Sequence, residues 1–305
     1  EDLPLNISRE TLQANPLIAK IKAGLVKKVL GELAKIAENE PDRYLKFWEN
    51  FGAVLKEGIY EDEANRPALM KLARFRTTNG DGWVSLAEYI GRMKDGQSAI
   101  YTISGDELVA LQRSPHLEGF KAKGVEVLLL TDPVDEFWVQ AVGEYEGKPF
   151  KSATRGAADL DAVKQADGDK AGPKNEPKAE GIDNLVALMR LTLKDAVKDV
   201  RISDRLTESA CCLVAAEGDL DIHLEKLLRQ HKKLETSLPR VLEINGTHPT
   251  VAALAKAISK TGSGGDTVAD ACWLLLDQAR IQDGETLPDP AAFARRMNAF
   301  MQKAV

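Results

Sequence analysis

Apolar residues in the first hundred positions recur at the spacing of amphipathic helices. After Asn15 and Pro16, which suit a helix cap and a first helical turn, they follow at steps of three and four residues. A second stripe begins at Tyr44 and stops before Gly58, and a third follows Pro67. The pattern predicts three helices that share a buried seam, with the apolar positions Ile18, Ile21, Leu25, Val29, Leu33, Ile36, Tyr44, Phe47, Phe51, Leu55, Leu69, Leu72 and Phe75.

The pattern changes near residue 97, where short apolar runs typical of strands replace the helical stripes. AIYTIS at 99–104 and VEVLLL at 125–130 are strand-like, and helical stretches near Glu107 and Leu117 separate them. This part reads as a small α/β unit that ends near Phe150. Further on we expect a helix from Ile182, strands at 200–203, 211–216 and 240–245, and two packed helices at the end. The alternation predicts a helix-rich α+β or α/β fold.

One long stretch has no apolar period. Residues 156–181 are rich in Gly, Ala, Asp, Lys and Pro, which is typical of a linker. A chain of 305 residues is also long enough for roughly two ordinary domains. We therefore expect a domain boundary in this stretch.

The bulk composition is that of a globular protein, with 44% hydrophobic and 29% charged residues. The formal net charge of −6 argues against nucleic acid as a partner, and the absence of a long apolar run argues against a membrane span. Three cysteines without zinc-ligand spacing are expected to be reduced and mostly buried. The chain begins at Glu1 inside an expected structured segment, so we expect it to be part of a longer protein.

The stretch TTNGDGWVSLAE at 77–88 matches most of the calcium-loop template. Asn79, Asp81 and Glu88 stand at ligand positions, but Thr77 stands where the first acidic ligand belongs. The competing interpretation is a pair of Asn-Gly and Asp-Gly turns followed by a capping box from Ser85 to Glu88. We favour the turn, expect no metal site, and keep a calcium-binding module as a third hypothesis.

Other chemistry-bearing residues are scattered. The glycines at 262, 264 and 265 lack the strand and the lysine-hydroxyl pair of a phosphate loop and are read as a helix connection. The histidines have no carboxylate or cysteine at ligand spacing, which favours structural or surface roles for His116, His223, His231 and His248.

Two segments carry more apolar surface than one core can take. Phe137 and Trp138 are neighbours on an expected helix, so one of them should face solvent or a partner. The stretch at 220–234 has a leucine stripe with Ile222 outside it, which is either core or an adhesive helix face.

Arg9 raises a question of its own. In LPLNISRETLQ, Asn6 or Ser8 can cap a helix and Glu10 suits its first turn, so Arg9 lies at the positive end of the helix dipole. A pairing with a surface carboxylate such as Glu10 is the simplest explanation. The functional explanation is that Arg9 belongs to a site for an anion at the helix start.

Five segments together carry a resemblance to a known family. They are EDLPLNISRETLQ, KFWENFGAVLKEGIYED, SLAEYIGRMKDGQSAIYTI, EVLLLTDPVDEFWVQ and LEINGTHP, in that order. The chain resembles the 90-kDa heat-shock chaperone family, and most of all its bacterial members, over almost its whole length. The stretches at 156–181 and near residue 264 have no recognisable counterpart.

The resemblance implies a domain plan. Residues 1–155 would be the later part of a middle domain, with a catalytic loop at 1–13, a helical coil at 14–96 and a small α/β unit at 97–155. Residues 156–181 would be a linker, and residues 182–305 a C-terminal dimerisation domain. The ATP-binding N-terminal domain would be absent.

The resemblance also implies a function: an ATP-dependent chaperone that holds and remodels non-native client proteins as a dimeric clamp in the bacterial cytoplasm. ATP and Mg would bind the missing domain, so this chain alone is expected to bind no cofactor and not to hydrolyse ATP. Partners would be clients and a second copy, not nucleic acid or membrane. A nucleotide-independent dimeric scaffold or holdase is the alternative. The implied catalytic residues are Arg9, Gln13 and Asn6, the client-binding residues Phe137, Trp138, Leu220, Ile222, Leu224, Leu227 and Leu228, and the dimer-interface residues Cys272, Leu275, Leu276, Phe293, Met297 and Phe300.

Overall fold

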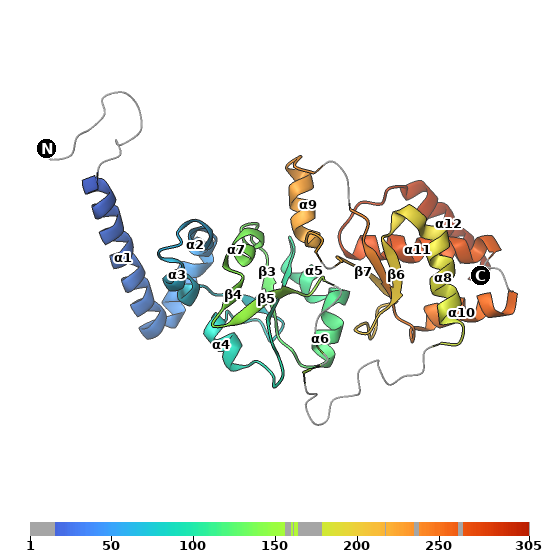
Figure 1. Ribbon diagram of the computed structural model, residues 1–305, viewed down its shortest axis with the longest axis horizontal. Coiled ribbons are helices and arrows are strands. Elements are labelled where there is room, and N and C mark those ends of the chain that lie inside the picture. Colours follow the sequence, from blue (N-terminus) through green and yellow to red (C-terminus); the bar gives the residue numbers. More distant parts are fainter. Residues whose placement is uncertain are drawn as a thin grey trace. The chain divides into compact units, whose positions relative to one another are not determined.

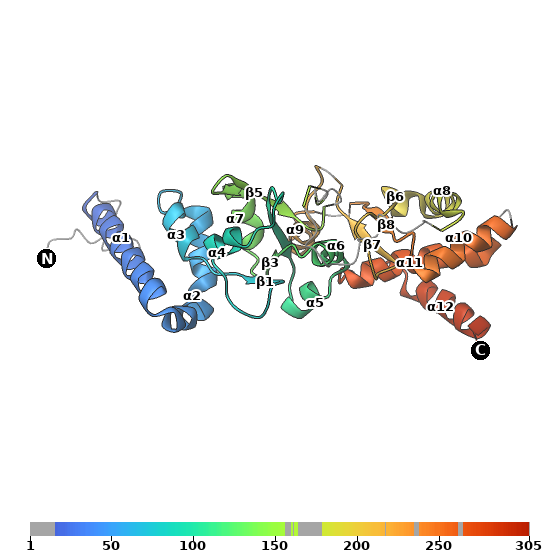
Figure 2. The same ribbon diagram turned by 90° about the horizontal axis from the view of Figure 1, so that it is seen from below.

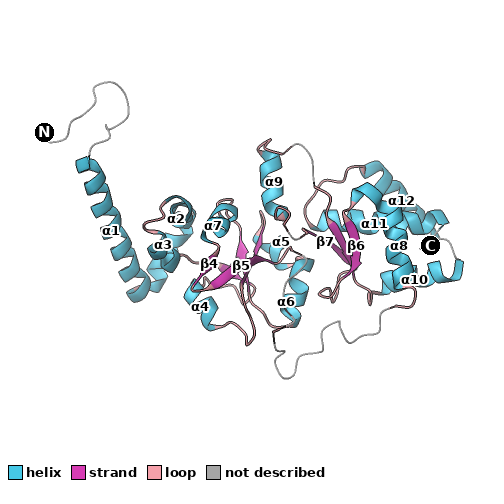
Figure 3. Ribbon diagram, viewed as in Figure 1, coloured by secondary structure: helices cyan, strands magenta, loops and turns pink. Residues whose placement is uncertain are grey.

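The computed structural model describes residues 16–155, 160, 162–163, 179–216, 218–234, 238–261 and 265–304. They form two compact units, one reaching to Arg74 with Ser85–Ala87, the other containing Phe75–Val84 and the chain from Glu88 onward. Helices dominate and the sheets are mixed (Figure 3), which confirms the expected helix-rich α+β class. The domain boundaries expected from the sequence stay a prediction.

The first unit contains α1 (Pro16–Asn39), α2 (Pro41–Glu61) and α3 (Arg66–Leu72). The buried Tyr44 hydroxyl joins α2 to the end of α3 by donating to the Leu72 carbonyl at 2.7 Å. The expected end of the second helix before Gly58 is wrong, because α2 continues to Glu61. A Cβ atom at Gly58 would lie 3.1 Å from Leu69 Cδ1, so the glycine there allows close packing and does not end the helix.

The apolar stripe of α1 is buried only toward its C-terminal end. Leu33 is 9% exposed, whereas Ile21, Leu25 and Val29 are 46%, 58% and 54% exposed. The expected seam is therefore only partly formed among the described residues. Phe75, expected in the third helical stripe, lies beyond the end of α3 in the second unit, where its backbone pairs with Val84.

The second unit contains a five-stranded sheet in the order β1-β3-β2-β5-β4. The central pairs β2–β3 and β2–β5 are parallel, and the outer pairs β1–β3 and β4–β5 are antiparallel. We call this sheet and its helices the α/β lobe. Its elements are β1 (Arg76–Thr77), β2 (Ile100–Ser104), α5 (Leu108–Gln112), a 3-10 turn (Pro115–Leu117), α6 (Glu118–Ala122), β3 (Val127–Leu130), α7 (Asp135–Val142), β4 (Glu144–Tyr145) and β5 (Lys148–Ser152). The helix α4 (Leu86–Gly91) has its first two residues in the first unit and the rest in the second.

A second sheet has three strands in the order β6-β8-β7, with β6–β8 parallel and β7–β8 antiparallel. Buried side chains of this sheet, α8, α10 and α11 form one core, and we call this part the C-terminal lobe (Figure 1). Its elements are α8 (Ile182–Leu193), a 3-10 turn (Lys194–Ala196), β6 (Asp199–Ile202), β7 (Cys211–Val214), α9 (Ile222–Gln230), β8 (Val241–Ile244), α10 (Pro249–Thr261), α11 (Gly265–Gln282) and α12 (Pro290–Ala304). All three cysteines are buried free thiols, as expected.

The described ends of the expected linker pack on the two lobes. Leu160 and Val163 are 6% and 4% exposed and belong to the core of the α/β lobe. Ala179 packs against the core of the C-terminal lobe, and its N–H donates to the Gly246 carbonyl at 3.3 Å. The expected linker residues between Val163 and Ala179 lie outside the described part.

Polar contacts also join the two lobes directly. The Glu118 carboxylate accepts hydrogen bonds from the backbone N–H groups of Thr207, Glu208 and Ser209 at 2.7, 2.9 and 3.0 Å. The buried Arg205 guanidinium donates to the Ala153 carbonyl at 2.8 Å. These charge-assisted bonds hold α6 and the end of β5 against the C-terminal lobe.

Candidate functional site

Phe137 and Trp138 on α7 point to different environments. Trp138 is fully buried: its Nε1 donates to Asp135 Oδ1 at 2.6 Å, and its ring lies 5.6 Å from Phe75 and 5.4 Å from Phe150. Phe137 is 42% exposed. Successive helix residues are about 100° apart, so one of them must turn outward. The expectation that one aromatic of this pair faces outward is confirmed. Of the two aromatics, only Phe137 is exposed in this structure.

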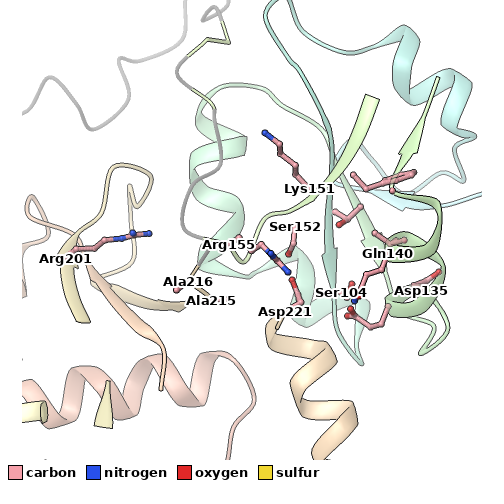
Figure 4. A pocket seen from close by; sticks show the side chains of 15 residues that line it. Ser104, Asp135, Gln140, Lys151, Ser152, Arg155, Arg201, Ala215, Ala216 and Asp221 are labelled. Carbon is pink, nitrogen blue, oxygen red and sulfur yellow. The ribbon is translucent and has the colours of Figure 1, made fainter. Parts of the chain in front are cut away.

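A cleft of about 480 Å³ opens beside this helix. We call it the α7–β5 cleft, because α7 and β5 supply much of its wall, with β2 and the chain after β7 supplying more (Figure 4). Its apolar lining is Val139, Phe150, Ala215 and Ala216, and its charged lining is Asp135, Glu136, Lys151, Arg155, Arg201 and Asp221. Gln140, one helical turn after Phe137, also lines the cleft, whereas Phe137 itself is not among the lining residues.

His223 at the start of α9 lies between carboxylates of the α/β lobe. Its Nδ1 is 2.9 Å from Glu136 Oε1 and its Nε2 is 3.2 Å from Asp106 Oδ1. Only the protonated ring can donate from both nitrogens. Burial favours the neutral ring, but the hydrogen bonds to Glu136 and Asp106 outweigh it and raise the pKa of His223 above its ordinary value. Burial also raises the pKa of Glu136.

This geometry predicts a pH dependence of stability. A raised pKa in the folded state means that protonation of His223 stabilises the fold; the contribution is complete below the ordinary pKa of 6.5 and is lost as the pH rises through the folded-state value. The difference in Tm between wild type and His223→Gln should therefore be larger at about pH 6 than at about pH 8. Lys226, which pairs with Asp106, and Asp221, which accepts from the His223 N–H, are present in both proteins, so the comparison isolates the His223 ring.

Thermal unfolding followed by circular dichroism across this pH range tests the expectation. His231→Gln is the matched control, because His231 lies exposed at the end of the same helix. A Tm difference for His223→Gln that grows with pH would contradict the assignment.

The leucine-rich stretch at 220–228 consists of Leu220, Asp221 and the first seven residues of α9. Asp221 caps the helix by accepting from the His223 N–H at 3.2 Å. Ile222, Leu224 and Leu227 are 8%, 6% and 8% exposed, and Leu220 and Leu228 are half-buried. These side chains therefore present little apolar surface to a client in this conformation, and their client-binding role stays a prediction.

The residues expected at a dimer interface fall into two groups. Cys272, Leu275 and Leu276 on α11 are at most 4% exposed and belong to the core of the C-terminal lobe. Because α11 packs against β7 and α8 of the same chain, these side chains present little surface to a second copy in this conformation, and their role at a dimer interface stays a prediction. The helix α12 is the last element of the chain (Figure 2). Its Met297 is 39% exposed and its Phe293 and Phe300 are half-buried, so this helix retains an apolar face.

The catalytic residues expected from the resemblance, Arg9, Gln13 and Asn6, lie outside the described residues, as do Gly262 and Gly264. At the calcium-loop match, α4 begins at Leu86, directly after Ser85, as the capping-box interpretation predicts. Within the described ranges, no group of three or more His, Cys, Asp or Glu residues could hold a metal ion. None of the described helices is both long and apolar enough to cross a membrane.

Sequence reasoning missed the contacts that build this site. His223 meets Glu136 and Asp106, which are 87 and 117 residues away in the chain, and His116 meets Asp283 at 3.3 Å across 167 residues. The histidines were expected to be structural or surface groups, and no local spacing indicates such distant partners. No motif or spacing in the sequence indicated that Arg155 would line the cleft.

Comparisons with known proteins bear on the whole chain. The family model described as Hsp90 protein matches residues 1–305. The chain is 53% identical over 305 residues to the chaperone protein HtpG of Paramagnetospirillum magneticum, covering 100% of this chain and 49% of that relative. It is 52% identical to those of Roseobacter denitrificans and Rhodospirillum rubrum over 307 and 309 residues, with the same shares of each chain. The chain thus spans about half the length of these relatives. The family resemblance predicted from its motifs is confirmed, and the chain belongs to the Hsp90 protein family.

Proposed function

We propose that this chain is the client-holding and dimerising part of an ATP-driven molecular chaperone of the Hsp90 family. Its relatives named chaperone protein HtpG support the chaperone function. Non-native client proteins and a second copy of the chain would be its partners. The bacterial cytoplasm is the proposed location.

The observation that carries the client-holding role is the exposed Phe137 on α7, the helix whose other residues line the α7–β5 cleft. An aromatic side chain that is 42% exposed, beside a cleft with both apolar and charged walls, suits weak binding to many unfolded segments. The buried Trp138 ring packs against Phe75 and Phe150, which fixes the orientation of α7 with Phe137 turned outward.

The ATP-driven part of the proposal depends on Arg9, with Gln13 and Asn6 in support. A helix start favours anions, and a guanidinium there strengthens the attraction for a phosphate. ATP and Mg would be bound by a domain outside these 305 residues, and Arg9 would reach the terminal phosphate when the domains close.

A nucleotide-independent dimeric scaffold or holdase is the second candidate. It is favoured by the fact that the exposed Phe137 and the apolar face of α12 both belong to this chain and need no nucleotide to form. Client protection that is unaffected by ATP in the natural full-length protein would support it over the first.

Suppression of the thermal aggregation of an unfolded model protein tests the client-holding role. The Phe137→Ser variant should need about threefold more chaperone for half-maximal protection, because the largest exposed side chain beside the cleft is lost. The matched control is Leu191→Ser, which removes a side chain that is 69% exposed on α8. Equal protection by wild type and Phe137→Ser, or an equal loss in Leu191→Ser, would count against the assignment.

A further inference from the structure

Arg155 brings a cation to the α7–β5 cleft without an ion pair to any described residue. Arg201, another cation of the lining, is held by Glu243, whose Oε1 lies 2.7 Å from its guanidinium. Lys151 likewise forms no ion pair within the described part of the chain, but in Figure 4 it points away from Asp221, whereas the Arg155 side chain points toward Asp221, another residue of the lining. Arg155 is therefore the cation best placed to meet a bound group.

The carboxylates that line the cleft are already engaged by the protein. Asp135 accepts from Trp138 Nε1 at 2.6 Å and from the Asp132 N–H at 3.1 Å. Asp221 accepts from the Thr154 hydroxyl at 2.9 Å and from the His223 N–H at 3.2 Å. Glu136 faces His223 at 2.9 Å. These bonds orient the three carboxylates within the wall and occupy their oxygens, which leaves the Arg155 guanidinium as a charged donor for a bound carboxylate.

The backbone of Arg155 is fixed where the two lobes meet. Its carbonyl accepts from Arg205 Nη1 at 3.2 Å, and it forms an isolated parallel bridge with Ala215 at the end of β7. The neighbouring Thr154 carbonyl accepts from the Ala215 N–H at 3.2 Å. The backbone of Arg155 therefore needs no reordering when its side chain binds a carboxylate, and the planar guanidinium limits the freedom lost per hydrogen bond.

We propose that the α7–β5 cleft binds a polypeptide segment in which an apolar side chain is followed closely by a carboxylate, with Arg155 as the partner of that carboxylate. The apolar side chain would lie against Val139 and Phe150, and the carboxylate would accept two hydrogen bonds from the planar guanidinium. The proposal rests on the proposed client-holding function and adds a chemical preference to it. The cleft would thereby favour acidic over neutral or basic unfolded segments.

Fluorescence anisotropy with the full 305-residue chain tests this preference. The probe is a short labelled, unstructured peptide with two apolar side chains, made in an aspartate form and in an otherwise identical asparagine form. Wild type should bind the aspartate form about fivefold to tenfold more tightly at low salt, because one charge-assisted pair is gained in a half-buried site. The preference should shrink as salt is added.

Arg155→Gln should abolish the preference while leaving the affinity for the asparagine form within about twofold. Arg155→Lys should retain part of it, because the charge remains but the planar pair of donors is lost. Arg113→Gln, which removes an exposed cation after α5, is the matched control and should keep the full preference.

A preference that persists in Arg155→Gln would overturn the inference, as would equal binding of both peptides by wild type. In either case the client-holding proposal would still stand, because it depends on the effect of Phe137→Ser. If neither peptide bound to wild type and Phe137→Ser had no effect on aggregation, the proposed function itself would fail.

Discussion

Replacing Arg9 by alanine in the natural full-length protein is expected to lower ATP turnover on the order of 10²-fold. Arginines that reach the transferred phosphoryl group accelerate other enzymes by roughly 10³ to 10⁵. We expect a smaller loss here, because closure of the domains would limit turnover and chemistry would be only part of the rate. The Kd for ATP should stay within about threefold, since Arg9 would act on the terminal phosphate only after closure.

Steady-state turnover and ATP binding should be measured separately, since their comparison distinguishes catalysis from nucleotide affinity. Arg9→Lys should recover only a fraction of the lost rate, because an ammonium lacks the planar donors of a guanidinium. Lys20→Ala is the matched control, as it removes an exposed cation from α1. Unchanged turnover in Arg9→Ala would mean that the stretch around Arg9 is only a helix start, with the cation paired to a surface carboxylate such as Glu10.

Periodicity in the sequence predicted elements well, because each helix or strand carries its own repeat of apolar residues. The helix from Pro16 and the strands at 100–104, 127–130 and 211–214 lie where the pattern placed them. It could not predict which elements cover each apolar face. Val29 is 54% exposed although it shares a stripe with the buried Leu33, and the buried Leu276 lies in the core of its own chain. Val29 and Leu276 each belong to an apolar stripe with helical spacing, so the pattern alone does not distinguish the exposed residue from the buried one.

The sequence predicted the candidate site only where the exposure of a side chain depends on residues adjacent to it in the chain. Two adjacent aromatics on a helix must diverge, so an exposed member of the pair at Phe137 and Trp138 could be expected. The pairing of His223 with Glu136, and the position of Arg155 against Ala215, depend on how two sheets come together. Contacts between residues so far apart in the chain cannot be predicted from residue spacing in one sequence.

The second large effect is expected at α12. Met297 and Met301 are 39% and 59% exposed, and with the half-buried Phe293 and Phe300 they lie on one face of this helix. In a symmetric dimer such a face would bury itself against the same face of the second copy. Placing Glu at both Met297 and Met301 should raise the dimer Kd by about 10² to 10³, because two carboxylates from each copy would be buried without partners, at a total cost of roughly 3–4 kcal/mol.

Sedimentation velocity over a range of concentrations measures this Kd. Substitutions on the surface of α12 are a better test than removal of the chain after residue 260, because α11 supplies Leu275 and Leu276 to the core. The matched control places Glu at Asn298 and Gln302, which are exposed, have the same spacing and lie about 100° around the same helix from Met297 and Met301. If the control dissociated the dimer as strongly as the Met297 and Met301 variant, the effect would come from net charge. If neither did, the two copies would meet through a different surface, since carboxylates introduced on the apolar face of α12 would then have remained in water.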